Sequence, residues 1–292
     1  MQLRATIIGS GAIALWSFLA LFTSITGGIP AFQLLFLTFL CGGTVGLLAL
    51  IVKGTTFKKL SSQPPKIWLI GIGGLFGYHF FYFTALGLAP VEDASLIAYL
   101  WPLLIVLLSP LVLDDKLRWF HIMGAFTAFT GAILLLISKG EASFSSGFSF
   151  GYSMALGSAI IWAVYSILNR TIKNVSTDMV AIYCLGTALL GGLCHLLLET
   201  WIAPSGTQWT AIGVLGLGPV GAAFYAWDYG TKHGNIRLLG VLSYAAPLLS
   251  TIILILSGHA LFSWGLITAC LLIVGGAIIA SLDIIKSQTQ SN

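Results

Sequence analysis

Charged residues are scarce in this chain: aspartate, glutamate, lysine and arginine together make up 8% of its 292 residues. An ordinary soluble domain carries about 25% charged residues. Hydrophobic residues reach 58% of the chain, and they fall in long runs with almost no charge. This composition excludes a soluble globular domain and indicates a protein of the lipid bilayer.

Residues that mark metal sites and enzymes are also few. The four cysteines, Cys41, Cys184, Cys194 and Cys270, fall inside apolar runs without metal-type spacing, so we expect no metal site. The chain has no His-Glu-x-x-His string and no acidic pair inside a run, so we assign no catalytic residue. A membrane-embedded enzyme stays an alternative that the sequence does not favour. No polar segment is long enough to hold a soluble cofactor, so no cofactor is expected.

Ten apolar runs approach the roughly 20 residues that a helix needs to cross a bilayer. They predict an all-α, polytopic membrane protein with ten transmembrane helices. The first run is too long for a secretory signal and lacks a cleavage pattern, so we expect it to be retained. The runs lie at about residues 4–26, 31–52, 66–87, 93–113, 118–137, 148–170, 178–201, 209–230, 236–257 and 262–284.

The basic residues test this topology, because lysine and arginine next to spans are retained on the cytoplasmic side. With the amino terminus inside, twelve of the thirteen basic residues fall on the inner side and only Lys139 falls outside. We therefore expect both termini in the cytoplasm. The basic residues are spread over the inner loops instead of forming a stripe, so the lipid bilayer is an expected partner and nucleic acid is not.

The sequence repeats itself at an offset of 145 residues, which pairs Tyr99 with Tyr244 and Pro102 with Pro247. The halves are residues 1–140 and 147–286, followed by a short cytoplasmic tail at 287–292. Each half holds five spans, and an odd number places the second copy upside down relative to the first. Two inverted five-helix repeats around a central cavity predict alternating access to a site near the midplane.

Aromatic residues with polar atoms gather near the centres of the spans, although such residues normally lie at the membrane interfaces. At mid-depth they need hydrogen-bond partners or a wet cavity, so we predict that they bind substrate. Pro102 and Pro247, near the middle of their spans, should bend those helices and act as a hinge or gate. The predicted substrate-binding residues are Trp16, Tyr78, His79, Tyr82, Tyr99, Trp101, Trp162, Tyr165 and Tyr244.

His79 is the only ionisable residue close to the middle of a predicted span, and its role is open. It is a neutral imidazole bonded to a neighbour, a substrate contact or a proton-linked group. No aspartate, glutamate, lysine or arginine lies at mid-depth, which disfavours phosphorylated substrates and active drug pumping through a buried carboxylate. A neutral or zwitterionic small molecule with an apolar or aromatic side chain fits these walls better.

Residues nearer the span ends are left out of the predicted site. We expect His195, Glu199 and Asp228 to reach water. An interfacial belt explains the remaining tryptophans, which are Trp68, Trp119, Trp201, Trp209, Trp227 and Trp264.

Four strings give the chain a family resemblance: Tyr99-Leu-Trp-Pro102, Trp162-Ala-Val-Tyr165, Ala226-Trp-Asp-Tyr-Gly230 and His233-Gly-Asn235. Together with the five-plus-five repeat, they make essentially the whole chain similar to the drug/metabolite transporter superfamily, in its EamA branch. The resemblance implies a basket of ten helices in a bacterial inner membrane, with a central cavity, that exports amino acids and related compounds. A monomer is one possible form, and the sequence leaves the oligomeric state open. Asp228 departs from the amide that is usual at this position in the amino acid exporters of the branch.

The alternative within this superfamily is a proton-coupled exporter of drugs or metabolites. An open pore is disfavoured because the spans are too apolar to supply a continuous polar lining.

Overall fold

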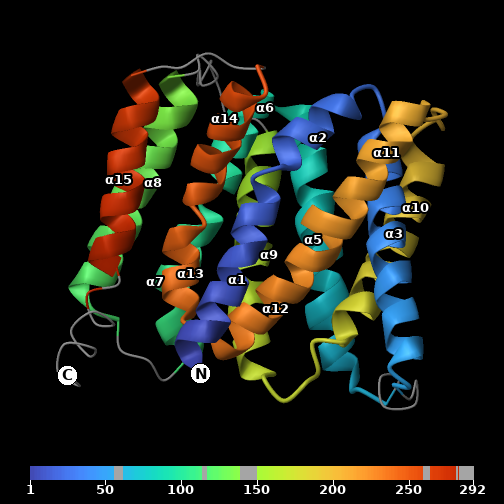
Figure 1. Cartoon of the computed structure of the whole chain (residues 1–292), viewed down its shortest axis with the longest axis horizontal. Coiled ribbons are helices and arrows are strands. Elements are labelled where there is room, and N and C mark those ends of the chain that lie inside the picture. Colours follow the sequence, from blue (N-terminus) through green and yellow to red (C-terminus); the bar gives the residue numbers. More distant parts are fainter. Residues whose placement is uncertain (56–61, 114–116, 139–149, 259–263, 281, 283–292) are drawn as a thin grey trace.

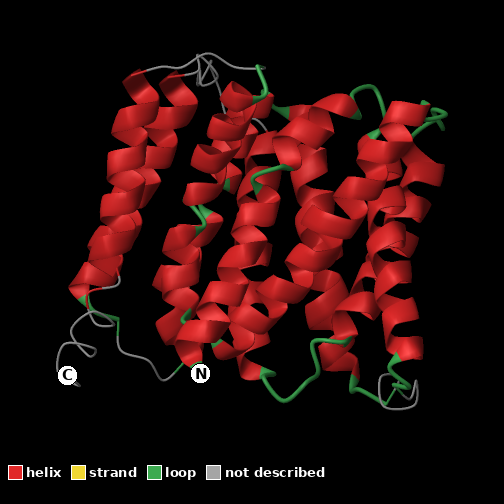
Figure 2. Cartoon of the chain, viewed as in Figure 1, coloured by secondary structure: helices red, strands yellow, loops and turns green. Residues whose placement is uncertain are grey.

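The computed structural model describes residues 1–55, 62–113, 117–138, 150–258, 264–280 and 282, and these residues contain helices and no strand (Figure 2). Lys58, Lys59, Lys116, Lys139, Lys286 and the predicted tail 287–292 lie outside this range. The helices are α1 (Gln2–Trp16), α2 (Leu19–Ile25), α3 (Ala31–Val52), α5 (Pro65–Leu88), α6 (Val91–Ala98), α7 (Trp101–Val112), α8 (Trp119–Ser138), α9 (Phe150–Thr171), α10 (Met179–Leu198), α11 (Gly206–Leu215), η1 (Gly216–Ala222), α12 (Ala223–His233), α13 (Ile236–Leu242), α14 (Ala245–Leu256) and α15 (Trp264–Ala280).

These helices form ten crossings within the described residues. Eight helical segments are long and apolar enough to span a bilayer, and two shorter apolar helices begin at Trp119 and Trp264. The ten predicted spans and the all-α fold class are therefore confirmed. In Figure 1, α1 begins and α15 ends at the same, lower end of the molecule, as an even number of crossings requires.

The helices pair in a pattern that maps onto itself when the two halves are exchanged. Two pairs join repeat mates, α3 with α10 and α8 with α15. Two further pairs, α5 with α9 and α1 with α12, are converted into each other by the exchange. In Figure 1, α1 rises from the lower end whereas its mate α9 descends from the upper end, so the halves have opposite orientation. The residue boundaries of the halves stay a prediction.

Three crossings are interrupted near their middle: between α1 and α2, between α6 and α7, and between α13 and α14. Pro102 is the second residue of α7, and Pro247 is the third residue of α14. The N–H groups of a helix's first turn have no partner within the helix, so proline is tolerated there. Helix breaks thus occur where bends were expected, and each proline starts the helix after the break instead of kinking a continuous one.

Glycines let α8 and α15 approach closely at the edge of the molecule. A Cβ atom built on Gly276 would lie 2.5 Å from the Gly124 carbonyl oxygen, which no real contact allows. A Cβ atom built on the adjacent Gly275 would meet nothing within 4 Å. The crossing therefore depends on one glycine and not on its neighbour.

We predict that Gly276→Ala destabilises the protein by about 1–3 kcal/mol, because the two helices must move apart to fit the methyl group. Gly275→Ala is the matched control and should be neutral or slightly stabilising, since alanine favours helix more than glycine does. Thermal unfolding of the purified protein in detergent measures both. Equal melting temperatures for the two variants would contradict the close crossing.

Candidate functional site

Four tryptophans from four crossings meet at one point, and we call them the tryptophan cluster: Trp16 on α1, Trp101 on α7, Trp162 on α9 and Trp227 on α12. Each ring contacts the other three, with all six centroid distances between 5.2 and 6.4 Å. Trp162 and Trp227 are 3% and 0% exposed. Two of these helices come from each half, so the cluster lies where the halves meet.

Trp16 is also fixed by a hydrogen bond, because its Nε1 donates to the Pro219 carbonyl oxygen at 3.0 Å. Pro219 belongs to η1, a π-helical turn inserted between α11 and α12. Such turns leave backbone carbonyls outside the regular α-helical pattern and often occur at functional sites. Here the turn supplies the acceptor for the tryptophan that ends α1.

Three tyrosines border the cluster, and we call Tyr78, Tyr82 and Tyr99 the tyrosine wall. Tyr78 stacks on Tyr82, with ring centroids 5.8 Å apart and planes 9° from parallel. Tyr78 also contacts Trp162 at 5.0 Å, so the wall is continuous with the tryptophan cluster. The Tyr82 hydroxyl lies 3.0 Å from Ser95 Oγ. Tyr99 lies close enough to interact electrostatically with both other tyrosines.

The tyrosine wall is partly exposed, whereas three of the four tryptophans of the cluster, Trp101, Trp162 and Trp227, are buried and Trp16 is partly exposed. Every residue from 76 to 84 of α5 is partly exposed, whichever way it faces. A helix that faces lipid on one side and a packed core on the other would bury its inner face. Because Tyr78 and Tyr82 contact the interior and are still partly exposed, the inner face of this half of α5 is not fully covered by neighbouring side chains.

His79 is held by its own helix. Its Nδ1 lies 2.7 Å from the Leu75 carbonyl oxygen, so the ring donates this bond as an N–H group. The rings of Phe39, Tyr78 and Phe224 lie 5.0 to 6.3 Å from it and form aromatic surroundings. This geometry suits a neutral imidazole whose other nitrogen remains available to a ligand.

The structure does not bring all predicted site residues together. Tyr165 is buried beneath Trp162, with ring centroids 5.3 Å apart. Tyr244 is 0% exposed and belongs to a second hydrophobic core formed by α7, α8 and α13 to α15, where it contacts Phe129. Pro102 and Pro247 follow the helix breaks next to Tyr99 and Tyr244. Tyr244 is thus separate from the tryptophan cluster.

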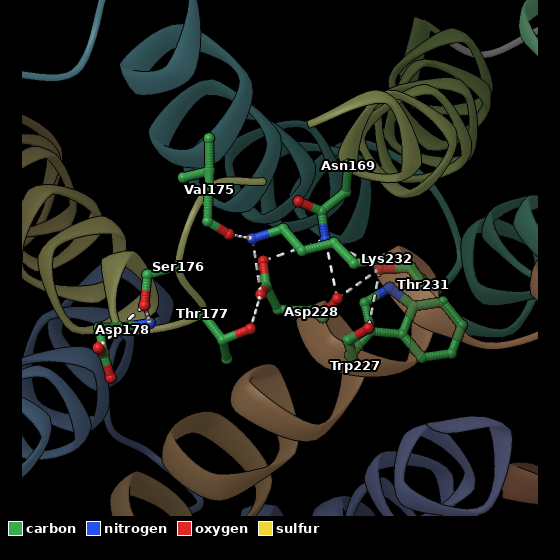
Figure 3. Close-up of polar contacts among 9 residues, drawn as sticks. All are labelled: Asn169, Val175, Ser176, Thr177, Asp178, Trp227, Asp228, Thr231 and Lys232. Carbon is green, nitrogen blue, oxygen red and sulfur yellow. Dashed lines mark hydrogen bonds and ion pairs between the residues drawn. The ribbon is translucent and has the colours of Figure 1, made fainter. Parts of the chain in front are cut away.

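Two expectations about α12 were wrong. Trp227 was assigned to the interfacial belt, but it is a fully buried member of the tryptophan cluster. Asp228 was expected to reach water, but it is 0% exposed and forms an ion pair with Lys232 at 2.9 Å (Figure 3). The helix continues to His233, three residues past the predicted span end, which places both residues deeper. Trp227 is the repeat mate of Tyr82, and this pairing could have revealed it.

His195 and Glu199 were also expected to reach water, but His195 is buried and Glu199 is only partly exposed. His195 is 4% exposed and lies 3.0 Å from the Glu199 carboxylate. That carboxylate accepts hydrogen bonds from the backbone N–H groups of Phe32 and Gln33, at 2.9 and 3.0 Å. Glu199 therefore caps the start of α3 and ties the two halves together at the upper end.

The EamA-like transporter family matches the chain twice, at residues 3–137 and 149–282. The chain is 52% identical over 279 residues to the aromatic amino acid exporter YddG of Ancylobacter novellus, covering 95% of this chain and 97% of that protein. It is 25% identical over 303 residues to the exporter of the same name from Escherichia coli, covering 96% and 97% of the two proteins.

A solved crystal structure superposes with a TM-score of 0.90 at 51% sequence identity, covering 97% of this chain and 98% of that one. The duplicated match agrees with the two five-helix halves, and together the two segments span nearly the whole sequence. The multi-pass helical fold and the double match lead to one conclusion: the chain belongs to the EamA-like transporter family.

Proposed function

We propose that this protein exports amino acids with aromatic or other neutral side chains across a bacterial inner membrane. The observation that carries the proposal is the tyrosine wall, which is partly exposed and continuous with the tryptophan cluster. Aromatic faces pack against aromatic and aliphatic side chains, and phenol hydroxyl groups supply polar contacts. The names of the relatives above support the same substrate class.

The proposed mechanism is alternating access between the two inverted halves, without a cofactor. Residues 76–84, in the upper half of α5 in Figure 1, are partly exposed, whereas the polar side chains of Asn169, Asp228 and Lys232, between α9 and α12 toward the lower end, are buried. We assign this difference in burial between the two ends to one of the two states. Exchanging the conformations of the halves would produce the other state.

Flux into liposomes tests this function. Purified protein reconstituted into liposomes should move radiolabelled phenylalanine, tryptophan and threonine faster than empty liposomes do. Aromatic substrates should compete with one another if they share the tyrosine wall. No flux of any amino acid above empty liposomes would refute the proposal.

We propose that the lower end in Figure 1 faces the cytoplasm. Eight of the thirteen basic residues are described, and all eight lie at helix ends or loops of this lower end. Retention of lysine and arginine on the cytoplasmic side then orients the protein.

Cysteine labelling in intact cells tests this orientation. In a cysteine-free background, Thr207→Cys at the upper end should react with a membrane-impermeant thiol reagent. Gln2→Cys at the start of α1 should react only after the cells are opened. Labelling of both positions in intact cells would mean that the start of α1 is accessible from outside the cell, which contradicts the proposal.

A substitution of His79 distinguishes facilitated export from proton-coupled export. Its bond to the Leu75 carbonyl and its aromatic neighbours favour a neutral ring throughout transport. We predict that His79→Asn, which keeps an N–H donor near that carbonyl, lowers flux several-fold but leaves the shape of the flux profile between about pH 5.5 and 8 unchanged. A pH dependence that is present in the wild type and absent in the variant would instead indicate proton coupling.

A further inference from the structure

A buried ion pair lies next to the tryptophan cluster, toward the lower end of the molecule in Figure 1. Asp228 and Lys232 lie one turn apart on α12, at 0% and 1% exposed, with Lys232 Nζ 2.9 Å from Asp228 Oδ2. Trp227, the neighbour of Asp228 in the chain, contacts the other three rings of the cluster. The two charges therefore lie just below the aromatic site, on the side away from the partly exposed half of α5.

Each charge also bonds to groups outside α12, as Figure 3 shows. Asp228 accepts hydrogen bonds from Asn169 Nδ2 on α9 at 3.1 Å and from Thr177 Oγ1 in the loop before α10 at 2.6 Å. Lys232 Nζ donates to the Val175 carbonyl oxygen in the same loop at 2.9 Å. These bonds fasten the end of α12 to α9 and to the segment that follows it.

Arg170 extends this fastening through the backbone. Its Nη1 donates to the carbonyl oxygens of Lys232 and Gly234, at 2.6 and 3.0 Å. The closed end is therefore held by side chains and carbonyls of α9 and the loop, all directed at the last turns of α12. Opening this end requires that the hydrogen bonds from α9 and the loop to α12 break. Asp228 and Lys232 stay close to each other during this motion because both lie on α12.

Fold stability alone does not explain the ion pair. Removing two charges from water costs more than their attraction recovers unless the geometry is very favourable, and apolar pairs of similar size often replace buried ion pairs without loss. In membrane helices, ionisable groups are usually functional for the same reason. The carboxylate of Asp228 and the ammonium of Lys232, held together beside an aromatic site, are complementary to the ammonium and the carboxylate of an amino acid.

We infer that Asp228 and Lys232 bind the backbone of the substrate, Asp228 its ammonium group and Lys232 its carboxylate, when the lower end opens. The inference rests on the proposed amino acid substrate. A zwitterion can exchange its own charges for the internal ion pair, so neither protein charge is left unpaired. Its side chain then reaches the tryptophan cluster through Trp227.

The exchange links substrate recognition to opening. The substrate competes for Lys232 Nζ with the Val175 carbonyl, and for the Asp228 carboxylate with Thr177. A molecule that carries only one of the two charges leaves the other protein charge buried and unpaired. The lower end, proposed to be cytoplasmic, therefore selects zwitterions before the aromatic site selects the side chain.

Two phenylalanine analogues test the assignment, each lacking one backbone charge: phenylalaninamide has no carboxylate and N-acetylphenylalanine has no ammonium. The wild type in liposomes should move phenylalanine at least about tenfold faster than either analogue, since a site built for a polar group rejects ligands without it. In Lys232→Gln the preference over phenylalaninamide should fall about tenfold, and in Asp228→Asn the preference over N-acetylphenylalanine should fall about tenfold.

Flux ratios remain informative when a variant folds poorly, because both substrates sample the same folded fraction. The double variant Asp228→Asn with Lys232→Gln leaves no buried charge and should lose both preferences. Glu199→Gln is the matched control, since Glu199 likewise contacts a residue one helical turn away, His195 on α10 at 3.0 Å, but lies at the upper end. Its two ratios should equal those of the wild type.

The outcome is decided by these ratios. Unchanged ratios in both single variants and in the double variant, with total flux lowered, would overturn the inference and leave the ion pair as a structural latch only. Flux of phenylalanine by the wild type tests the proposed function separately. That flux can succeed while the ratios fail, so the two failures are distinguishable.

Discussion

Trp162→Ala is expected to reduce amino acid flux at least about tenfold. Trp162 is 3% exposed, and its ring contacts the three other members of the tryptophan cluster as well as Tyr78 and Tyr165. Replacing a buried tryptophan with alanine costs about 3–5 kcal/mol, because the cavity that remains is only partly refilled. The lost packing free energy comes from the contact between the two halves, where we propose that the substrate packs.

Two measurements separate transport from stability in this variant. Flux is normalised to folded protein, and the melting temperature is measured in detergent. Trp162→Phe keeps one aromatic ring and should recover part of the flux. Trp264→Ala is the matched control, because Trp264 is 80% exposed at the start of α15, and it should change flux less than about twofold. Normal flux in Trp162→Ala would show that substrates pass elsewhere.

The positions of the spans could be predicted from the sequence because they depend on local properties. Ten apolar runs of membrane-spanning length, with basic residues segregated to one side, leave few alternative topologies. The offset of 145 residues also identified the two five-span halves, whose opposite orientation the structure shows. Sequence reasoning worked where each span could be treated as a unit.

Depth within a span was harder to predict. The end of α12 was placed at Gly230, whereas the helix continues to His233 and buries Asp228 and Lys232. Their i,i+4 spacing permits a pair on one helix face, but burial depends on Asn169, Thr177 and Val175, which are far away in the sequence. Hydropathy alone contains no information about these tertiary partners.

Repeat symmetry also has limits as a guide to the site. Tyr99 and Tyr244 are repeat mates, yet Tyr99 belongs to the tyrosine wall and Tyr244 contacts Phe129 in the second core. Repeat mates also differ in residue type, since Tyr82 has Trp227 as its mate. Equivalent positions therefore carry different roles, and a site built from several helices must be located by contacts.

The second large effect concerns the stability of the closed lower end. Lys232→Met is expected to destabilise the protein by about 3–5 kcal/mol, because it leaves the Asp228 carboxylate buried without a counter-charge. Adding Asp228→Asn should restore most of this loss, since the amide is neutral and still accepts the bond from Thr177. Lys173→Met is the matched control at an exposed lysine of the same end.

A double-mutant cycle on melting temperature or denaturant unfolding measures this coupling directly. Strong coupling means that the two charges are tolerated only as a pair. A substrate can then replace the internal ion pair only if it carries both charges, as a zwitterion does. If the single variants were additive and mild, water would already reach these charges in the folded protein. The pair would then provide no selective barrier, and zwitterion exchange would lose its energetic basis.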